Sequence, residues 1–447
     1  ADTLLEPAEP RYDAILGNPP WEKIARHDPR RAAFESAYAE VREGEINLHA
    51  LFLVWSLRSL KPGGRLTFIT PNTWLLNRWD AKLRAFVLAY EVEEVALLAA
   101  GTFPDTPITL PAVITIRRPG ARASSQPRVA GEAQELAVES IRVSAPGIES
   151  ACDAGIWRSR PFCQMSVFDD ARLAAIDAKM RKRSVPLGSL ARASDGIYTS
   201  TARANAIWIH SRPQARESSA PEVGRPDADS SDSVPAGDPL RSSRRILLSG
   251  TEVSRDLAVH RGAWIPETLW RLHVEAQECP RLALHAARHP ALSRRLVGAV
   301  VPPGLFTSNR FINVRSDSED LWFLTAVLLS RPIDGYFARR FPVADIDAFM
   351  LAQLPVPATA APVKAALAAA ARLRAALRRG VFYALLACAD LRLPCIGLTS
   401  LIETLVRLEA SIDDEVADLL GLDAEDAAFL AVPARSGLVG SARRSGV

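Results

Sequence analysis

The sequence predicts an α/β fold for the first 120 residues, followed by an α+β region and a helical C-terminal region. Strand-like and helix-like stretches alternate between residues 12 and 117, which is typical of a mostly parallel sheet covered by helices. Short β-rich runs recur further along the chain, and long apolar helical patterns follow them. We therefore divide the chain into four parts: 1–120, a connector 121–185, 186–360 and 361–447.

The first region begins with residues 12–17, which we interpret as a short buried strand ending in a turn. A mixed helical stretch follows at 29–42, and an apolar helix at 47–60 ends at Lys61-Pro62-Gly63-Gly64. The remaining predicted elements are a strand at 65–70, a helix at 80–90, and strands at 94–98 and 111–116. Because sites in such sheets form at the carboxyl ends of strands, we expect one directly after residue 17.

The later regions are less regular. Residues 120–150 are polar and rich in turn formers, and 166–183 is a predicted helix. Residues 211–243 are rich in Ser, Pro, Asp and Arg, which predicts a flexible insertion. The other predicted elements are strands at 206–210, 245–249 and 310–314, and helices at 321–329, 362–379 and 399–420.

Composition excludes some classes of protein. Hydrophobic residues make up 48% of the 447 residues, but no apolar run is long enough to cross a membrane. The five cysteines are odd in number and none forms a C-x-x-C pair, so we expect no disulfide framework and no zinc or other metal site. Such cysteine usage suits a reducing cytoplasm. The net charge of +3 does not by itself indicate nucleic-acid binding.

The tetrad Asn18-Pro19-Pro20-Trp21 suits chemistry on a planar aromatic amine. Such an amine is a poor nucleophile because its lone pair is delocalised into the ring. The Asn18 side-chain oxygen and the Pro19 carbonyl oxygen can each accept a hydrogen bond from one of its two N–H groups. These two hydrogen bonds would localise the lone pair and orient the amine. The prolines stiffen the backbone, and Trp21 offers a face for an extruded base. Taken alone, Asn-Pro-Pro is equally consistent with a turn, and Trp21 with a core anchor.

Residues 12–21, Tyr-Asp-Ala-Ile-Leu-Gly-Asn-Pro-Pro-Trp, resemble motif IV of the gamma-class amino-methyltransferases. Within that class they most resemble the type IIG restriction–modification branch. Residues 47–74 and 95–117 are similar to the helix and strands that follow in that family. The resemblance implies that the first region is the C-terminal part of a Rossmann-like methyltransferase sheet. It also implies that Phe103 packs on the second face of a flipped adenine; a plain core Phe is the alternative.

Three later segments, at 195–199, 246–253 and 306–311, resemble parts of these enzymes' target recognition domains. The resemblance therefore implies that 186–360 is a target recognition domain and that double-stranded DNA is the partner. In that order of segments, Lys182, Arg203 and Arg255 are the basic residues expected to face DNA. A solvated basic residue is the commoner case for each of them.

The family's Gly-rich loop for the methyl donor S-adenosylmethionine precedes motif IV, but only seventeen residues precede Asn18 here. Neither Val297–Gly304 nor Ser436–Gly446 has the strand and helix that such a loop requires. We expect the chain to hold the base-binding half, and to be truncated or to need an upstream polypeptide for donor binding. No donor-binding residue is assigned, and Asn18 is expected to border the donor site.

The resemblance thus implies a site-specific adenine-N6 DNA methyltransferase of a restriction–modification or phage-defence system. Two alternatives stay open. One is an enzyme of the same fold that methylates another planar amine, such as a glutamine side chain or an RNA base. The other is an inactive fragment or a DNA-specificity subunit that needs a partner chain for donor binding.

Overall fold

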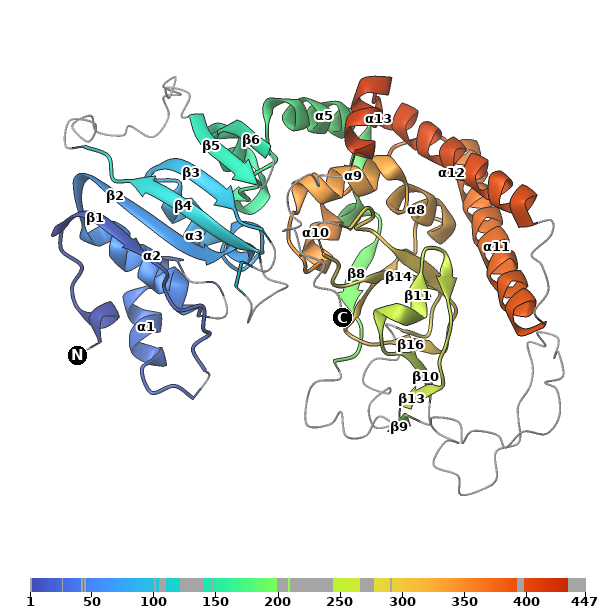
Figure 1. Cartoon of the computed structure of the whole chain (residues 1–447), viewed down its shortest axis with the longest axis horizontal. Coiled ribbons are helices and arrows are strands. Elements are labelled where there is room, and N and C mark those ends of the chain that lie inside the picture. The colour runs from blue at the N-terminus through green and yellow to red at the C-terminus, as the bar shows by residue number, and fades with distance from the viewer. Residues whose placement is uncertain are drawn as a thin grey trace, which may run out of the picture.

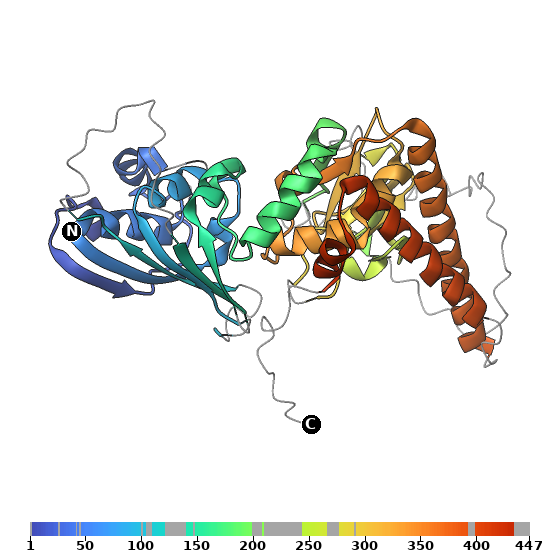
Figure 2. The same ribbon diagram turned by 90° about the horizontal axis from the view of Figure 1, so that it is seen from above.

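Two lobes form the described part of the chain, and the segment that carries α4 (Ala154–Ser159) and α5 (Ala171–Lys182) connects them (Figures 1 and 2). The structure is a computed structural model. It describes residues 2–25, 27–41, 43, 46–99, 102–103, 110–120, 140–145, 148–198, 208–209, 244–265, 277–289, 292–391 and 398–432. The predicted insertion at 211–243 lies outside these residues.

A six-stranded sheet of the described chain forms the first lobe, in the order β1-β2-β4-β3-β5-β6. Its strands are β1 (Tyr12–Gly17), β2 (Leu60–Pro71), β3 (Glu91–Leu97), β4 (Pro111–Arg117), β5 (Ser140–Ala145) and β6 (Ile148–Asp153). Only the β1–β2 and β3–β5 pairs are parallel. The prediction of a mostly parallel sheet is therefore wrong, because β4 runs back between β2 and β3 and pairs antiparallel with both.

Helices cover one face of this sheet (Figure 1). They are η1 (Thr3–Leu5), α1 (Arg31–Ala37), η2 (Ala39–Val41), α2 (Leu48–Ser59), η3 (Asn72–Leu75) and α3 (Ala81–Val87). The predicted helix at 47–60 is confirmed as α2, whose Leu53, Val54 and Leu57 are fully buried in the core below the sheet. The opposite face carries charged pairs such as Arg65–Glu93, so it is suited to solvent.

The prediction that residues 12–17 form a strand is confirmed, but the prediction that the strand is buried is wrong. β1 lies at the edge of the sheet, where the Leu16 side chain is 78% exposed and Tyr12 is 43% exposed. On its other side, β1 approaches β2 closely at Gly64, where an added Cβ would lie 3.1 Å from the Tyr12 and Asp13 carbonyl oxygens. β1 is exposed because no described strand pairs with its outer edge.

The first lobe extends past its expected boundary at residue 120. β5 pairs in parallel with β3, and β6 forms a hairpin with β5, so residues 140–153 belong to the same sheet. The expected connector, 121–185, therefore begins with sheet strands and continues through α4, η4 (Pro161–Cys163) and α5. β5 carries the apolar–polar alternation of a half-buried strand, but the polar, turn-rich composition of residues 120–150 outweighs that short signal in the sequence.

The second lobe is an α+β unit that β7 (Ser184–Pro186) and β18 (Pro355–Pro357) close at its two ends by pairing antiparallel. Its two four-stranded sheets have the orders β16-β10-β13-β9 and β15-β14-β17-β8, and β11 pairs with β12. The strands are β8 (Arg192–Asp195), β9 (Trp208–Ile209), β10 (Arg244–Leu247), β11 (Val253–Ser254), β12 (Leu257–Ala258), β13 (Ala263–Ile265), β14 (Arg281–His285), β15 (Gly298–Val301), β16 (Leu305–Thr307) and β17 (Phe311–Arg315). The helical elements are η5 (Leu187–Ser189), η7 (Gly250–Glu252), α8 (Leu321–Leu328), α9 (Arg331–Arg340) and α10 (Ala348–Ala352).

The helical C-terminal region consists of α11 (Ala361–Leu391), α12 (Leu398–Leu420) and α13 (Ala424–Ala431), which confirms the helices predicted at 362–379 and 399–420. α11 packs on the second lobe through a fully buried ion pair in which Arg374 donates to Asp256 from Nε (2.7 Å) and Nη2 (2.9 Å). No helix among the described residues is both long and apolar enough to span a membrane.

Buried polar contacts fix the two lobes to each other. The Asn72 side chain, at the end of β2, donates to the Pro342 carbonyl oxygen at 3.0 Å, and Ser166 Oγ donates to the Arg339 carbonyl oxygen at 2.7 Å. Arg340 donates to Gln164 Oε1 at 2.8 Å across the same junction. These side chains are all buried, so separating the lobes would leave several polar groups without partners.

Candidate active site

The tetrad Asn18–Trp21 directly follows β1, at the carboxyl end of the strand. β1 runs parallel to β2, and β2 and β3 share a direction because both are antiparallel to β4. The segments that follow β1, β2 and β3 therefore all leave the sheet along one border, which the carboxyl ends of these strands form. This border, and not the outermost strand, is here called the edge of the site. Gly17 fits there because an added Cβ would lie only 3.2 Å from the Phe68 ring.

Asn18 and Pro19 present two oxygen acceptors at this edge. The Asn18 side chain is exposed and has no hydrogen-bond partner among the described residues. Pro19 is buried, and no described backbone N–H donates to its carbonyl oxygen. The two prolines carry no N–H that would compete for these oxygens. The tetrad therefore has two acceptors available for the N–H bonds of an external amine.

Trp21 and Phe103 lie together, although they are 82 positions apart in the chain. The Trp21 indole N–H donates to the Ile69 carbonyl oxygen of β2 at 3.4 Å, which anchors the ring beside the sheet edge. The two ring centroids are 5.3 Å apart and the ring planes are 87° apart, an edge-to-face contact. A base held between the two rings requires one of them to turn, because perpendicular rings in contact leave no parallel slot.

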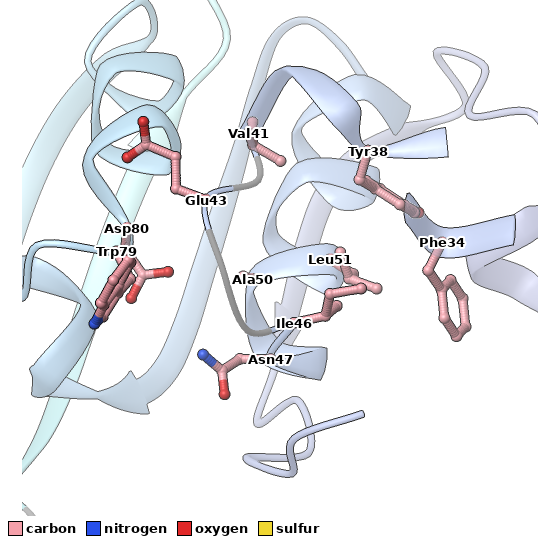
Figure 3. A pocket seen from close by; sticks show the side chains of 10 residues that line it. All are labelled: Phe34, Tyr38, Val41, Glu43, Ile46, Asn47, Ala50, Leu51, Trp79 and Asp80. Carbon is pink, nitrogen blue, oxygen red and sulfur yellow. The ribbon is translucent and has the colours of Figure 1, made fainter. Parts of the chain in front are cut away.

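The chain after the tetrad returns to the start of α2. Lys23 forms a backbone bridge with Asn47, and Leu48 N donates to the Glu22 carbonyl oxygen at 2.9 Å. A pocket lies beside this bridge, between the α1–α2 segment and the start of α3 (Figure 3). Ten residues line it: Phe34, Tyr38, Val41, Glu43, Ile46, Asn47, Ala50, Leu51, Trp79 and Asp80.

Asp80 is the buried acid of this pocket. Burial raises the pKa of its carboxyl group, opposed by a hydrogen bond from Asn77 and by the charges of Arg84 and Lys23. The start of α3 lies next to the segment that follows the tetrad, because Asp80 lines the pocket together with Asn47, whose backbone bridges Lys23. Sequence reasoning missed the 77–80 turn as part of the site edge. The turn follows the strand that ends at Pro71. That position in the chain was the available signal, because an aromatic side chain after this strand, here Trp79, lies at the same end of the sheet as the tetrad.

The three basic residues expected to face DNA have different surroundings. Lys182 is exposed at the end of α5. Arg255 is largely buried: it pairs with Glu409 at 2.8 Å, donates to the Leu329 carbonyl oxygen, and burial lowers its pKa to about 10. Arg203 lies outside the described residues. Of the two that are described, only Lys182 has its side chain open to solvent.

The described residues do not form a cradle for a nucleotide-like methyl donor. Such a cradle needs a Gly-rich turn between a strand and a helix, where a backbone without a Cβ can approach the ligand. The described glycines with positive φ are Gly63, Gly262, Gly304 and Gly421, and none of them joins a strand to a helix.

Comparison with known proteins finds a family match over the segment that contains this edge. Residues 5–97 match the Eco57I restriction-modification methylase family. This segment contains β1, the tetrad, α2, β2 and β3, but it is a minor part of the chain. The first lobe is thus similar in sequence to restriction-modification methylases.

Two curated relatives are type II methyltransferases. M.XhoI of Xanthomonas vasicola is 32% identical over 140 residues, which are 28% of this chain and 24% of that protein. M.PaeR7I of Pseudomonas aeruginosa is 33% identical over 132 residues, again 28% of this chain and 22% of that protein. The chain therefore spans about a quarter of the length of these relatives.

The fold as a whole is similar to that of a solved restriction-modification enzyme. The structure of the type IIL enzyme MmeI in complex with DNA aligns with 94% of this chain and 56% of that chain, with a TM-score of 0.53. The identity is 11%, so this likeness concerns the fold alone.

Proposed function

We propose that this chain carries the target-base half of a site-specific DNA methyltransferase that transfers a methyl group from S-adenosylmethionine to N6 of a flipped adenine. The observation that carries the proposal is the pair of open acceptors, Asn18 Oδ1 and the Pro19 carbonyl, beside the aromatic pair Trp21 and Phe103. The match of residues 5–97 to restriction-modification methylases supports a role in restriction–modification or phage defence.

In this proposal the tetrad prepares the amine. Asn18 Oδ1 and the Pro19 carbonyl oxygen each accept one N–H of the adenine amino group, so the nitrogen lone pair is drawn out of conjugation with the ring. The buried Pro19 and its neighbour Pro20 restrict the backbone that carries both acceptors, so the Pro19 carbonyl is held in place, while the exposed Asn18 side chain is oriented by the amine that it binds. An acceptor that is already in place costs no reorganisation when the amine becomes more positive, and this preorganisation is where such a site gains rate.

Trp21 and Phe103 hold the base. The Trp21 ring is anchored by its bond to the Ile69 carbonyl, so we assign the turn that opens the edge-to-face contact to Phe103. Stacking an extruded base on an aromatic ring contributes about 1–3 kcal/mol, which offsets part of the cost of unstacking it from the duplex. The aromatic pair therefore has a role only for a base that has left the double helix.

The second lobe is the proposed target recognition domain, and double-stranded DNA is its proposed partner. The fold of the whole chain is similar to that of MmeI, and this likeness supports the arrangement of the two lobes. Lys182, which is exposed where the segment between the lobes meets the second lobe, is a proposed phosphate contact. Arg255 is held by Glu409 and Leu329, so we do not place it at the DNA surface.

A further polypeptide is proposed to supply the donor-binding half. The support is the outer edge of β1, which presents Ala14, Leu16 and Gly17 to solvent. Exposed edge strands are normally protected by charge, proline or a covering element. On β1 the one charged side chain is Asp13, which is paired with Lys61, and the residues from Ala14 to Gly17 are apolar. An additional strand on this edge would cover them and place a donor site next to Asn18.

A DNA-specificity subunit without methyl transfer of its own is the second candidate. The absence of a donor cradle among the described residues favours it for the chain taken alone. An enzyme of the same fold that acts on another planar amine is the third reading, and the large second lobe disfavours it because a small target does not require such a unit.

Tritiated methyl transfer to duplex DNA tests the proposal, with the chain alone and with the polypeptide proposed to supply the donor-binding half. Asn18→Ala is expected to lower the rate about 10²–10³-fold, since one preorganised electrostatic contact is lost. Asn18→Asp, which keeps an acceptor oxygen, is expected to retain part of the rate. Circular dichroism and DNA affinity serve as folding controls. Equal transfer by the wild-type and Asn18→Ala proteins would sink the assignment.

A further inference from the structure

Arg78 and Trp79 form an exposed aromatic–cation pair close to the candidate site. The Trp79 side chain is 59% exposed, and the Arg78 guanidinium lies over its ring at 5.6 Å from the centroid. Exposing this much indole forfeits the hydrophobic stabilisation that a buried tryptophan gives. An exposed tryptophan on a chain that buries Trp74 and Trp157 completely therefore requires an explanation.

The turn that presents Trp79 is held rigidly. The Asn77 side chain donates to Asp80 Oδ2 at 2.5 Å, and Asp80 N donates back to Asn77 Oδ1 at 2.9 Å. One helical turn later, the buried Arg84 donates to the Trp74 carbonyl oxygen at 2.5 Å and to the Phe162 carbonyl oxygen at 3.0 Å. The backbone on both sides of Trp79 is thus fixed, so the exposure of the ring is a feature of the fold and does not result from local unfolding.

The turn lies at the same edge of the sheet as the tetrad. It follows the carboxyl end of β2, whereas Trp21 follows β1 and Phe103 follows β3. Asn47 lines the same pocket as Trp79 and Asp80, and its backbone bridges Lys23, two positions after Trp21. Figure 3 shows Trp79 and Asp80 on the wall of the pocket opposite Phe34 and Tyr38. Three aromatic side chains therefore follow β1, β2 and β3, the three strands that run in the same direction on the two sides of β4.

We propose that Trp79 is a second stacking surface for DNA, on which a base next to the extruded adenine rests. This inference depends on the proposed function, since it takes the DNA as already bound at the tetrad. The charges around the ring are mixed, with Arg78 over the ring and the acids Glu43 and Asp80 in the same pocket wall. A phosphate would gain little there, whereas the uncharged face of a base stacks on indole whatever the base sequence.

The test compares four variants of the full chain by the affinity for a fluorescent duplex and, with the polypeptide proposed to supply the donor-binding half added, by KM and kcat for methyl transfer. Trp79→Ala is expected to weaken the affinity about 5- to 150-fold, and Trp79→Phe, which keeps a stacking ring, is expected to stay close to wild type. Tyr383→Ala is the matched control, because Tyr383 on α11 is 57% exposed and lies on another element. Arg78→Ala measures the contribution of the Arg78 guanidinium to the affinity.

The dependence of affinity on salt separates stacking from phosphate contact. Trp79→Ala is expected to leave the slope of log affinity against log salt unchanged, because no phosphate contact is lost. Trp79→Ala and Tyr383→Ala proteins of equal affinity, or Trp79→Phe as weak as Trp79→Ala, would overturn the inference. If that happens while Asn18→Ala still abolishes methyl transfer, the proposed function stands and only the role of Trp79 is rejected. A wild-type chain that binds no duplex rejects both.

Discussion

Replacing Asp256 with asparagine is expected to destabilise the packing of α11 on the second lobe by about 3 kcal/mol. The Asp256 carboxylate accepts two hydrogen bonds from Arg374, both side chains are fully buried, and Arg378 Nε lies 3.3 Å away. Neutralising the carboxylate leaves the Arg374 charge in a dry site, and breaking such a pair from one side costs about 3–5 kcal/mol. Asparagine is chosen because Asp256 has a φ of 62°, which alanine would adopt only with added strain.

The free energy of unfolding in urea, followed by circular dichroism, measures this loss, and amide exchange along α11 locates it. Arg374→Met in the Asp256→Asn background is expected to recover most of the stability, because it removes the uncompensated charge and leaves a side chain of similar volume. A change below about 1 kcal/mol in Asp256→Asn, or a double variant less stable than Asp256→Asn alone, would refute the reasoning.

Three further predictions concern single side chains. His49 is buried with both ring nitrogens unpartnered among the described residues, and burial lowers its pKa from 6.5 to about 4. Since the unfolded chain takes up a proton first, stability should fall as pH drops from 6.5 toward 4, by up to ~3 kcal/mol, and His49→Leu should flatten that slope in urea titrations. Tyr336→Phe removes a buried donor to Asp177 and should cost about 1–3 kcal/mol in the same assay, against an unchanged fold by circular dichroism. Leu16→Asp should leave the thermal midpoint of the isolated chain within a few degrees of wild type, since Leu16 is 78% exposed, but should prevent co-purification with an upstream polypeptide.

The first lobe could be predicted from the sequence where local pattern and packing agree. α2 and β4 carry enough apolar residues in the right period that their limits were predicted to within two residues. The reversed direction of β4 could not be predicted, because strand direction depends on pairing with β2 and β3 and leaves no mark on composition. The exposure of β1 was missed for a related reason: its apolar run is typical of an interior strand, and it lies at an edge.

The candidate site shows the same division. Chemistry could be predicted at Asn18–Trp21 because two acceptors, two prolines and an aromatic are adjacent in the chain. The proximity of Phe103 to Trp21 came from resemblance to a family, and the structure places the two rings in contact. Trp79 was missed because its significance depends on which strand it follows. Arg255 was chosen for its charge, whereas its burial against Glu409 depends on how α12 packs.

The buried junction between the lobes fixes the distance between the candidate site and the second lobe. Asn72 joins the end of β2 directly to Pro342, so one short path of packed atoms connects the edge that holds the base to the lobe proposed to read the sequence. On that proposal, the number of base pairs from the methylated adenine to the recognised bases is a constant of the fold. Loops of the second lobe can then exchange one target sequence for another while the position of the modified base stays where it was.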